Sequence, residues 1–336
     1  MGGAVPESDT RDDRSAIARS TRYGLGRAGH ALAVVLAAWS VSFAVLFLLP
    51  GDPALNQVAG GDAGSIVNQA ELARVRAEQG FDDPVVVQYV HRLGDALTGD
   101  LGTSMETGRP VTDILLEALP PTIALISGAL VIGVALGGGL ALGATYTRTR
   151  WLRQLLLALP PAGISLPTFW VGLMLIQLFS FNLGLLPAIG SSGLESLVMP
   201  WLTLALPTAA TVGQILAKSL AQAQAEQFVT TARAIGLPRA VIHFRDVLRN
   251  ALIPALTICG TLIASLIGGS VVIENVFSRA GLGRITVHAV LSRDVAVVQG
   301  TVVLGAVIFV VVNLLIDLAY PLIDPRLRIH QEVGSR

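Results

Sequence analysis

The sequence predicts an all-α membrane protein whose chain crosses the bilayer several times. Of the 336 residues, 52% are hydrophobic and only 14% are charged, and the mean hydropathy is +0.66. This composition is too apolar for an ordinary soluble domain. Six apolar windows are each long enough to cross a bilayer as a helix, and basic residues gather beside alternate windows. The formal net charge is zero, so the composition gives no reason to expect a nucleic-acid partner.

The six windows are residues 31–49, 122–145, 155–179, 197–217, 251–273 and 299–323. Because no water reaches the bilayer core, the backbone of each window must satisfy its own hydrogen bonds, and we interpret each as a helix. The predicted organisation follows: a polar extension (1–28), a first span (29–50), an outer loop (51–118), a core with five further spans (119–325) and a short tail (326–336).

The distribution of basic residues predicts that both termini are cytoplasmic. Most of the 23 arginine and lysine residues precede the first window, lie between the second and third or the fourth and fifth windows, or follow the sixth. Basic residues are enriched in cytoplasmic loops. The segments assigned to the opposite side hold Arg74, Arg76, Arg92, Arg109, Arg279, Arg284 and Arg293. The first window is longer than a signal-peptide core and lacks a cleavage pattern, so we expect a retained anchor.

The outer loop is too long for a simple connector. Apolar residues at helical spacing predict an amphipathic helix from about Pro84 to Leu97 within a small outer subdomain. Acidic residues outnumber basic ones in this loop. Such a surface is either a solvated face or a docking surface, and the sequence does not decide between them.

Several spans carry prolines and glycines with structural consequences. Pro167 in "GISLPTFW" and Pro207 lie within windows, where a proline removes a backbone donor and can kink a helix. Kinked helices suit a gated path but also occur in static bundles. The second window has Gly133, Gly137, Gly139 and Gly143 at spacings that allow close helix approach, within one subunit or between two.

Polar residues are rare in the windows. Asn313 and Asp317 lie four residues apart in the sixth window and therefore on one helix face. A carboxylate at this depth needs a partner. Hydrogen bonding between helices explains the pair more simply than an ion pathway does.

The stretch "TTARAIGLPRAVIHFRDVLRNALIP", residues 230–254, predicts two helices separated by a turn. Gly236 can take the left-handed conformation that ends a helix, and Pro238 can begin the next one. An apolar stripe follows at Ala240, Val241, Phe244, Val247 and Leu248. A helix lying flat on the membrane is an alternative. The turn favours a segment that projects from the membrane and enters a groove on another protein.

Several common chemical sites have no counterpart in the sequence. There is no G-x4-G-K-[ST] phosphate loop, no HExxH and no G-x-S-x-G, and the single cysteine, Cys259, lies within an apolar window. We assign no catalytic residue and no metal ligand. The remaining classes are the permease of an ATP-driven importer, a self-contained secondary transporter and an intramembrane enzyme.

The 230–254 stretch resembles the "EAA" loop of permeases from binding-protein-dependent ABC importers, with the pattern E-A-A-x3-G-x9-I-x-L-P. Residues 230–236, "TTARAIG", occupy its first seven positions, whereas residues 246–249, "DVLR", replace I-x-L-P. These departures are similar to the dipeptide/oligopeptide branch, in which "TARAxG…LRNALIP" is usual. "LLPGDPA", "SLPTFWVGLMLIQLF", "GGSVVIENVFSRAGLGR" and "NLLIDLAYPLIDPRLR" resemble the same branch, over about residues 28–328. Ala280 stands where that branch usually has proline.

The resemblance implies the six-helix architecture of a type I ABC importer permease in the bacterial inner membrane, similar to the first permease of the dipeptide importers. Implied partners are a second homologous permease, two cytoplasmic ATPases, which would bind ATP and Mg, and an extracytoplasmic binding protein. The chain itself would bind no cofactor. Peptides are the default substrate, and nickel, glutathione and haem are the family's alternatives.

The resemblance also assigns roles to residues. The coupling loop spans about 226–254, and its expected ATPase-coupling residues are Thr230, Thr231, Ala232, Gly236, Leu237, Pro238, Arg239, Val241, Phe244 and Arg245. Arg239 and Arg245 would face ATPase carboxylates. The expected path or gating residues are Pro167, Pro207, Asn313 and Asp317.

Overall fold

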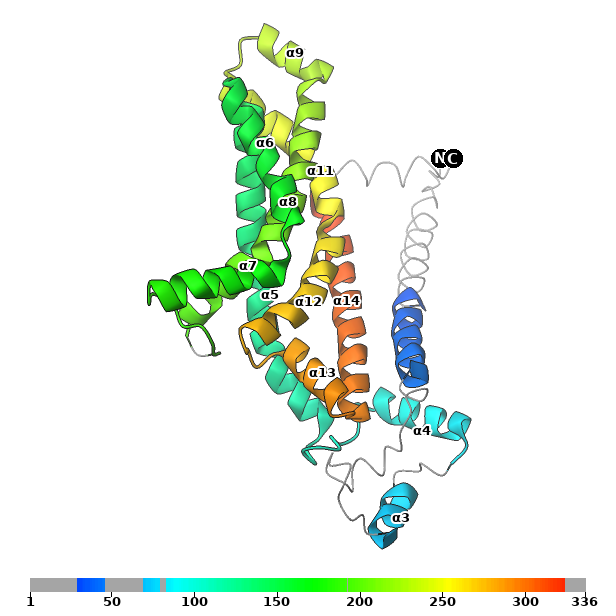
Figure 1. Ribbon diagram of the computed structural model, residues 1–336. Helices are drawn as coiled ribbons and strands as arrows, with labels where there is room; N and C mark the ends of the chain where they lie inside the picture. The colour runs from blue at the N-terminus through cyan, green and yellow to red at the C-terminus, as the bar shows by residue number, and fades with distance from the viewer. Residues whose placement is uncertain (1–28, 46–68, 79–82, 192, 324–336) are drawn as a thin grey trace, which may run out of the picture.

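The structure is a computed structural model that describes residues 29–45, 69–78, 83–191 and 193–323, and these residues are predominantly helical (Figure 1). Within these ranges the only β pairing is an isolated bridge between Thr103 and Pro110. This confirms the helical class. The predicted N-terminal extension, the tail and the end of the predicted first span lie outside the described residues.

The centre of the bundle is a pair of long helices, α5 (Val111–Tyr146) and α8 (Glu195–Gln224). Gly133 lies against Thr208, and Gly137 lies so close to α8 that a Cβ added there would be 2.3 Å from the Ala209 carbonyl oxygen. At these two positions the predicted small-residue spacing therefore packs two helices of one chain. We predicted that the outer loop ends at residue 118, whereas α5 begins at Val111, so the helix starts inside the predicted loop.

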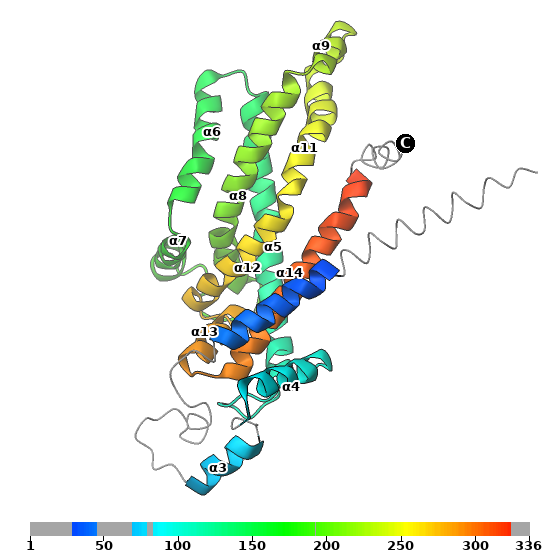
Figure 2. The same ribbon diagram turned by 90° about the vertical axis from the view of Figure 1, so that its right-hand side faces the viewer.

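The prediction of one helix for the third window is wrong. Residues 150–165 form α6 (Arg150–Ser165), and α7 (Thr168–Leu175) continues into the π-helical turn η1 (Ile176–Asn182), with the two parts bent by 99°. Leu166 is extended, as the residue before a proline usually is, and Pro167 caps α7. Figure 2 shows α6 upright beside the bundle, with α7 seen almost end-on below the lower end of α6. Pro167 therefore ends a helix rather than kinking one.

The fifth window is also divided. α11 (Leu248–Thr257) ends before Ile258, and α12 (Cys259–Val276) follows it. α13 (Leu282–Leu291) is a short helix after α12, and α14 (Val295–Ile323) covers the sixth window. By length and composition, three helices in the described part of the chain qualify as spans, namely α5, α8 and Val295–Leu315 of α14. The bent pair would be a fourth, so the structure supports several spans.

The outer-loop helices α3 (Gln69–Glu78) and α4 (Val85–Leu97) lie at one end of the bundle. α4 confirms the predicted amphipathic helix. The Tyr89 hydroxyl of α4 lies 2.7 Å from the Ser40 hydroxyl, and its ring meets Phe43 edge-on at 5.3 Å. These contacts hold α4 against the helix at 29–45. Figure 1 shows α4 and α9 at opposite ends of the molecule.

Buried polar contacts fix the loop between α12 and α13 at the same end. The Glu274 carboxylate accepts hydrogen bonds from the Thr122 hydroxyl at 2.6 Å and the Gly283 amide at 2.7 Å. The buried Arg279 guanidinium donates to the Ser196 carbonyl at 3.2 Å. Because buried polar groups need partners, these contacts specify how α12 and α13 meet α5 and α8.

Candidate coupling site

The segment at 226–254, which we call the elbow, forms a projection at the end of the bundle farthest from α4 (Figure 1). After α8 ends at Gln224, α9 (Gln227–Ala234) leads to a turn and then to α10 (Arg239–Val241). The π-helical turn η2 (Ile242–Val247) joins α10 to α11, so the returning arm is helical from Arg239 to Thr257.

The turn of the elbow is built as the sequence predicts. Gly236 has φ +83°, and its amide donates to the Arg233 carbonyl at 3.0 Å. The Leu237 amide donates to the Ala232 carbonyl at 3.1 Å. This pair of bonds is a Schellman motif, which ends a helix by satisfying its last carbonyls. Pro238, with φ −60°, then caps α10, so both sides of the turn are fixed.

An apolar cluster holds both arms of the elbow to the bundle. Val229 and Ala232 of α9 and Ile242 and Val247 of the returning arm are buried with Leu220 of α8. The predicted apolar stripe is therefore divided between two environments. Val247 and Leu248 pack in the chain's own core, whereas Ala240 and Phe244 remain exposed.

Arg239 bonds the elbow to the end of α5. Its guanidinium donates to the Tyr146 carbonyl and lies 4.8 Å from the centre of the Tyr146 ring. The rings of His243 and Phe244 each lie 5.3 Å from that of Tyr146. A guanidinium over an aromatic face is attracted by the ring quadrupole. In this structure Arg239 thus positions the elbow within its own chain.

The start of the elbow is fixed by Gln224. Its side-chain amide donates to the Thr145 carbonyl at 3.2 Å and lies 3.0 Å from Nδ1 of His243. With the Gln224 amide nitrogen as the donor, Nδ1 is the acceptor, which is the role it has in a neutral imidazole ring. The ends of α5 and α8 and the returning arm of the elbow are therefore joined through one histidine.

The environment of His243 predicts a pH effect. Burial is the main cause that lowers the pKa of His243 below its ordinary value of 6.5, and the nearby Arg239 guanidinium lowers this pKa further. The unfolded chain therefore takes up a proton before the folded chain does. The contribution to stability is complete above about pH 6.5 and is lost as the pH falls through the folded pKa.

We expect the midpoint of thermal unfolding of the purified chain to fall with pH below about 6.5, and to fall less in His243→Asn. The Asn amide oxygen replaces Nδ1 as an acceptor but does not titrate in this range. His91→Gln, at an exposed histidine of α4, is the control and should keep the wild-type pH dependence. An unchanged pH dependence in His243→Asn would contradict the assignment.

The exposed tip of the elbow contains a residue that the sequence analysis did not single out. Ile235 is 71% exposed, against 48% for Phe244, and Val241 is half-buried. Thr230 and Thr231 are exposed on α9. The only sequence signal for Ile235 is that an apolar residue stands directly before the helix-ending Gly236.

Arg245 pairs with the adjacent Asp246 at 2.9 Å, an exposed contact of small energetic effect.

The four predicted path residues are not brought together in one described site. Pro167 lies at the break between α6 and α7, and Pro207 lies inside the uninterrupted α8, where Thr211 donates to its carbonyl at 2.9 Å. The Asn313 amide donates to the Phe309 carbonyl of its own helix at 2.8 Å. Asp317 lies in α14, but its side chain is outside the described part of the chain.

Comparisons with known proteins agree with a membrane transport subunit. The family model described as "Binding-protein-dependent transport system inner membrane component" matches residues 111–329, and the model of its N-terminal part matches residues 21–126. The glutathione transport system permease protein GsiC of Salmonella typhimurium is 37% identical over 286 residues, 85% of this chain and 92% of that protein. GsiC of Escherichia coli K12 is 36% identical over the same shares.

The apolar helical bundle and these matches define the class as a polytopic transport permease. The chain belongs to the family of binding-protein-dependent transport system inner membrane components. It is an inner-membrane permease subunit of an ABC importer, of the peptide/oligopeptide-type branch.

Proposed function

We propose that the chain forms, with a second homologous permease, the path by which peptides enter the cell. A binding protein delivers the peptide from outside. Two cytoplasmic ATPases, which bind ATP and Mg, drive the cycle, so this chain is not itself catalytic. In this proposal the chain crosses the membrane six times and both termini are cytoplasmic. The broken window at Pro167 and the short apolar helices count among those crossings.

The construction of the elbow is the observation that carries the proposal. A lever must transmit displacement without bending. The Schellman motif at Gly236, the buried cluster around Val247 and the contacts of Arg239 with Tyr146 hold the elbow as one unit with α5 and α8. Its apolar tip residues Ile235 and Phe244 stay exposed, as expected of side chains that enter a groove on a partner.

The proposed substrate is a short peptide. The two relatives described above are named as glutathione permeases, and glutathione is itself a tripeptide. Glutathione therefore becomes the first specific candidate within the peptide class, ahead of nickel and haem. A secondary transporter would instead need several charged groups within its spans for ion coupling, and the six windows contain a single charged residue, Asp317, with the polar Asn313 on the same face.

Cross-linking tests the proposed contact with the ATPase. In a Cys259→Ala background, Ile235→Cys should react through a short thiol-to-amine cross-linker with an ATPase subunit of the assembled complex. Ile235 suits this test better than the half-buried Val241.

The matched control is Val86→Cys in the same background, at a 73% exposed position of α4 at the other end of the bundle. It should be labelled by impermeant reagents added outside and should give no ATPase adduct. An ATPase adduct from Val86→Cys, or outside labelling of Ile235→Cys, would contradict the proposed orientation.

A further inference from the structure

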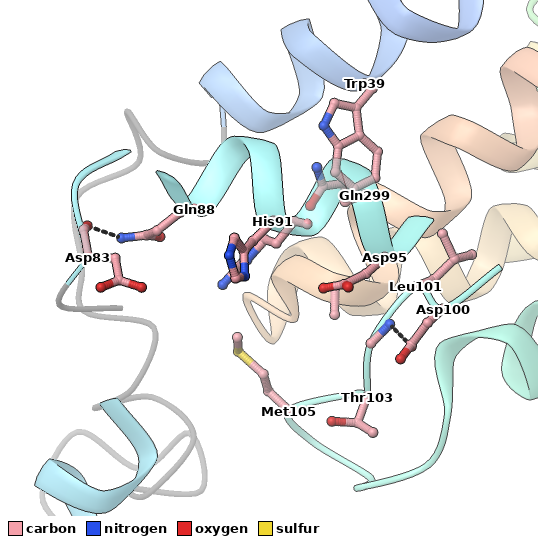
Figure 3. A pocket seen from close by; sticks show the side chains of 13 residues that line it. Trp39, Asp83, Gln88, His91, Asp95, Asp100, Leu101, Thr103, Met105 and Gln299 are labelled. Atoms are coloured by element: carbon pink, nitrogen blue, oxygen red, sulfur yellow. Dashed lines mark hydrogen bonds between the residues drawn. The ribbon is translucent and has the colours of Figure 1, made fainter. Parts of the chain in front are cut away.

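A pocket of about 490 Å³ lies beside α4 (Figure 3), at the end of the bundle opposite the elbow (Figure 1). Three parts of the chain that are distant in sequence form it: the helix at 29–45, α4 with the loop that follows it, and the start of α14. Its volume lies within the range of small-molecule sites. None of the coupling or path residues considered above lines it.

Two buried hydrogen-bond donors line this pocket without partners. Trp39 and Gln299 are each 4% exposed, and neither the Trp39 Nε1 nor the Gln299 Nε2 has an acceptor among the described residues. Leaving a buried donor without an acceptor is energetically unfavourable. A ligand with carbonyl or carboxylate oxygens would supply the missing acceptors.

The remaining polar wall of the pocket is mainly acidic. Asp83, Asp95 and Asp100 line it, together with Arg92, His91 and the uncharged polar residues Gln88 and Thr103. Asp100 accepts a hydrogen bond from the Gly102 amide at 2.8 Å. In the described part of the chain, the Asp83 and Asp95 carboxylates pair with no base and accept no hydrogen bond. They offer negative charge to a cationic group.

The cationic group is better explained as an amine than as a metal ion. No cluster of three or more His, Cys, Asp or Glu side chains with metal-binding geometry occurs among the described residues. An ammonium group requires only hydrogen-bond acceptors and negative charge, and the Asp95 carboxylate provides both.

We propose that this pocket binds a short zwitterionic peptide. The ammonium group of the ligand lies against the Asp95 carboxylate, and its carbonyl or carboxylate oxygens accept hydrogen bonds from Trp39 and Gln299. The proposal rests on the peptide import proposed above and adds to it a receiving site on the permease itself. The site lies at the end where a delivered peptide would arrive.

The test is calorimetric titration of the purified full-length chain in lipid nanodiscs, without ATPases or binding protein. The probe is dialanine, and N-acetyl-dialanine, which has no ammonium group, is the matched ligand control. We expect dialanine to bind and the acetylated peptide to bind at least tenfold more weakly. Asp95→Asn and Gln299→Leu should each weaken dialanine binding at least tenfold.

Asp113→Asn is the control variant, because Asp113 is exposed on α5 and does not line the pocket. It should bind dialanine as the wild type does. If Gln299→Leu fails to fold, dialanine binding by Asp95→Asn, a substitution at an exposed residue, is the deciding measurement. Failure of the wild type to bind dialanine would overturn the proposal, as would equal binding of both peptides or unaltered binding by Asp95→Asn.

These outcomes are separable from the proposed import function. ATP-driven uptake by a complex that binds no dialanine at this pocket would refute the site and leave the importer intact. If Asp95→Asn weakened only the affinity for the binding protein, the acidic wall would be a docking surface, and the peptide site would again be refuted.

Discussion

Gly236→Val is expected to leave the membrane bundle assembled but to uncouple ATP hydrolysis from uptake. Gly236 has φ +83°, and an added Cβ would meet no atom within 4 Å. The substitution therefore strains the backbone rather than the packing. Forcing valine into the left-handed region costs about 1–3 kcal/mol, and this strain acts at the turn that joins the two arms. The turn should rearrange, and the exposed tip should lose its position. The measurement is the ratio of transported peptide to hydrolysed ATP in a reconstituted complex.

Two variants separate this effect from general damage. Gly236→Asn should retain much of the coupling, because asparagine tolerates the left-handed conformation better than valine does. Gly184→Val makes a similar conformational demand at φ +62° in open space away from the elbow, and its coupling ratio should be normal. A wild-type ratio in Gly236→Val would remove the elbow turn from the mechanism.

Gly137→Ala is expected to cause a large loss of stability by forcing apart the two central helices. The added Cβ would lie 2.3 Å from the Ala209 carbonyl oxygen and 3.0 Å from its Cα, and these backbone atoms cannot move without separating α5 from α8. Overpacking of this kind costs about 1–3 kcal/mol. We expect a lower thermal unfolding midpoint for the purified chain and reduced yield of the assembled complex.

Gly139→Ala is the matched control on the same helix, two residues away. A Cβ at Gly139 meets nothing within 4 Å, so the substitution should be neutral or slightly stabilising, since alanine is favoured in helices by up to about 1 kcal/mol over glycine. Equal unfolding midpoints for the two variants would show that the close approach of α5 and α8 at Gly137 is not a determinant of stability.

The sequence predicted the helical class, the amphipathic helix α4 and the turn of the elbow, because each depends on local patterns. Apolar spacing locates α4, and glycine followed by proline two residues later specifies the turn at Gly236. Hydropathy did not locate the break in the third window. Apolar residues continue on both sides of Pro167, and the backbone restriction before proline separates α6 from α7.

The features that the sequence did not predict are contacts between distant segments. Arg239 was expected to face a partner carboxylate, whereas in the structure it contacts Tyr146, 93 residues away in sequence. The outer pocket joins Trp39 to Gln299 and to α4, and no local pattern marks these residues as neighbours. The exposure of Ile235 follows from the direction of the turn, which periodicity alone does not give.

Solute uptake into liposomes with and without the ATPase subunits tests the central claim most directly. The liposomes contain this chain and its partner permease, and the binding protein loaded with dialanine is added outside. We predict uptake only when both ATPases and ATP are present on the inner side, and none under a proton or sodium gradient without them. Gradient-driven uptake by the permeases alone would contradict the account, because it would show that transport needs no force delivered through the elbow.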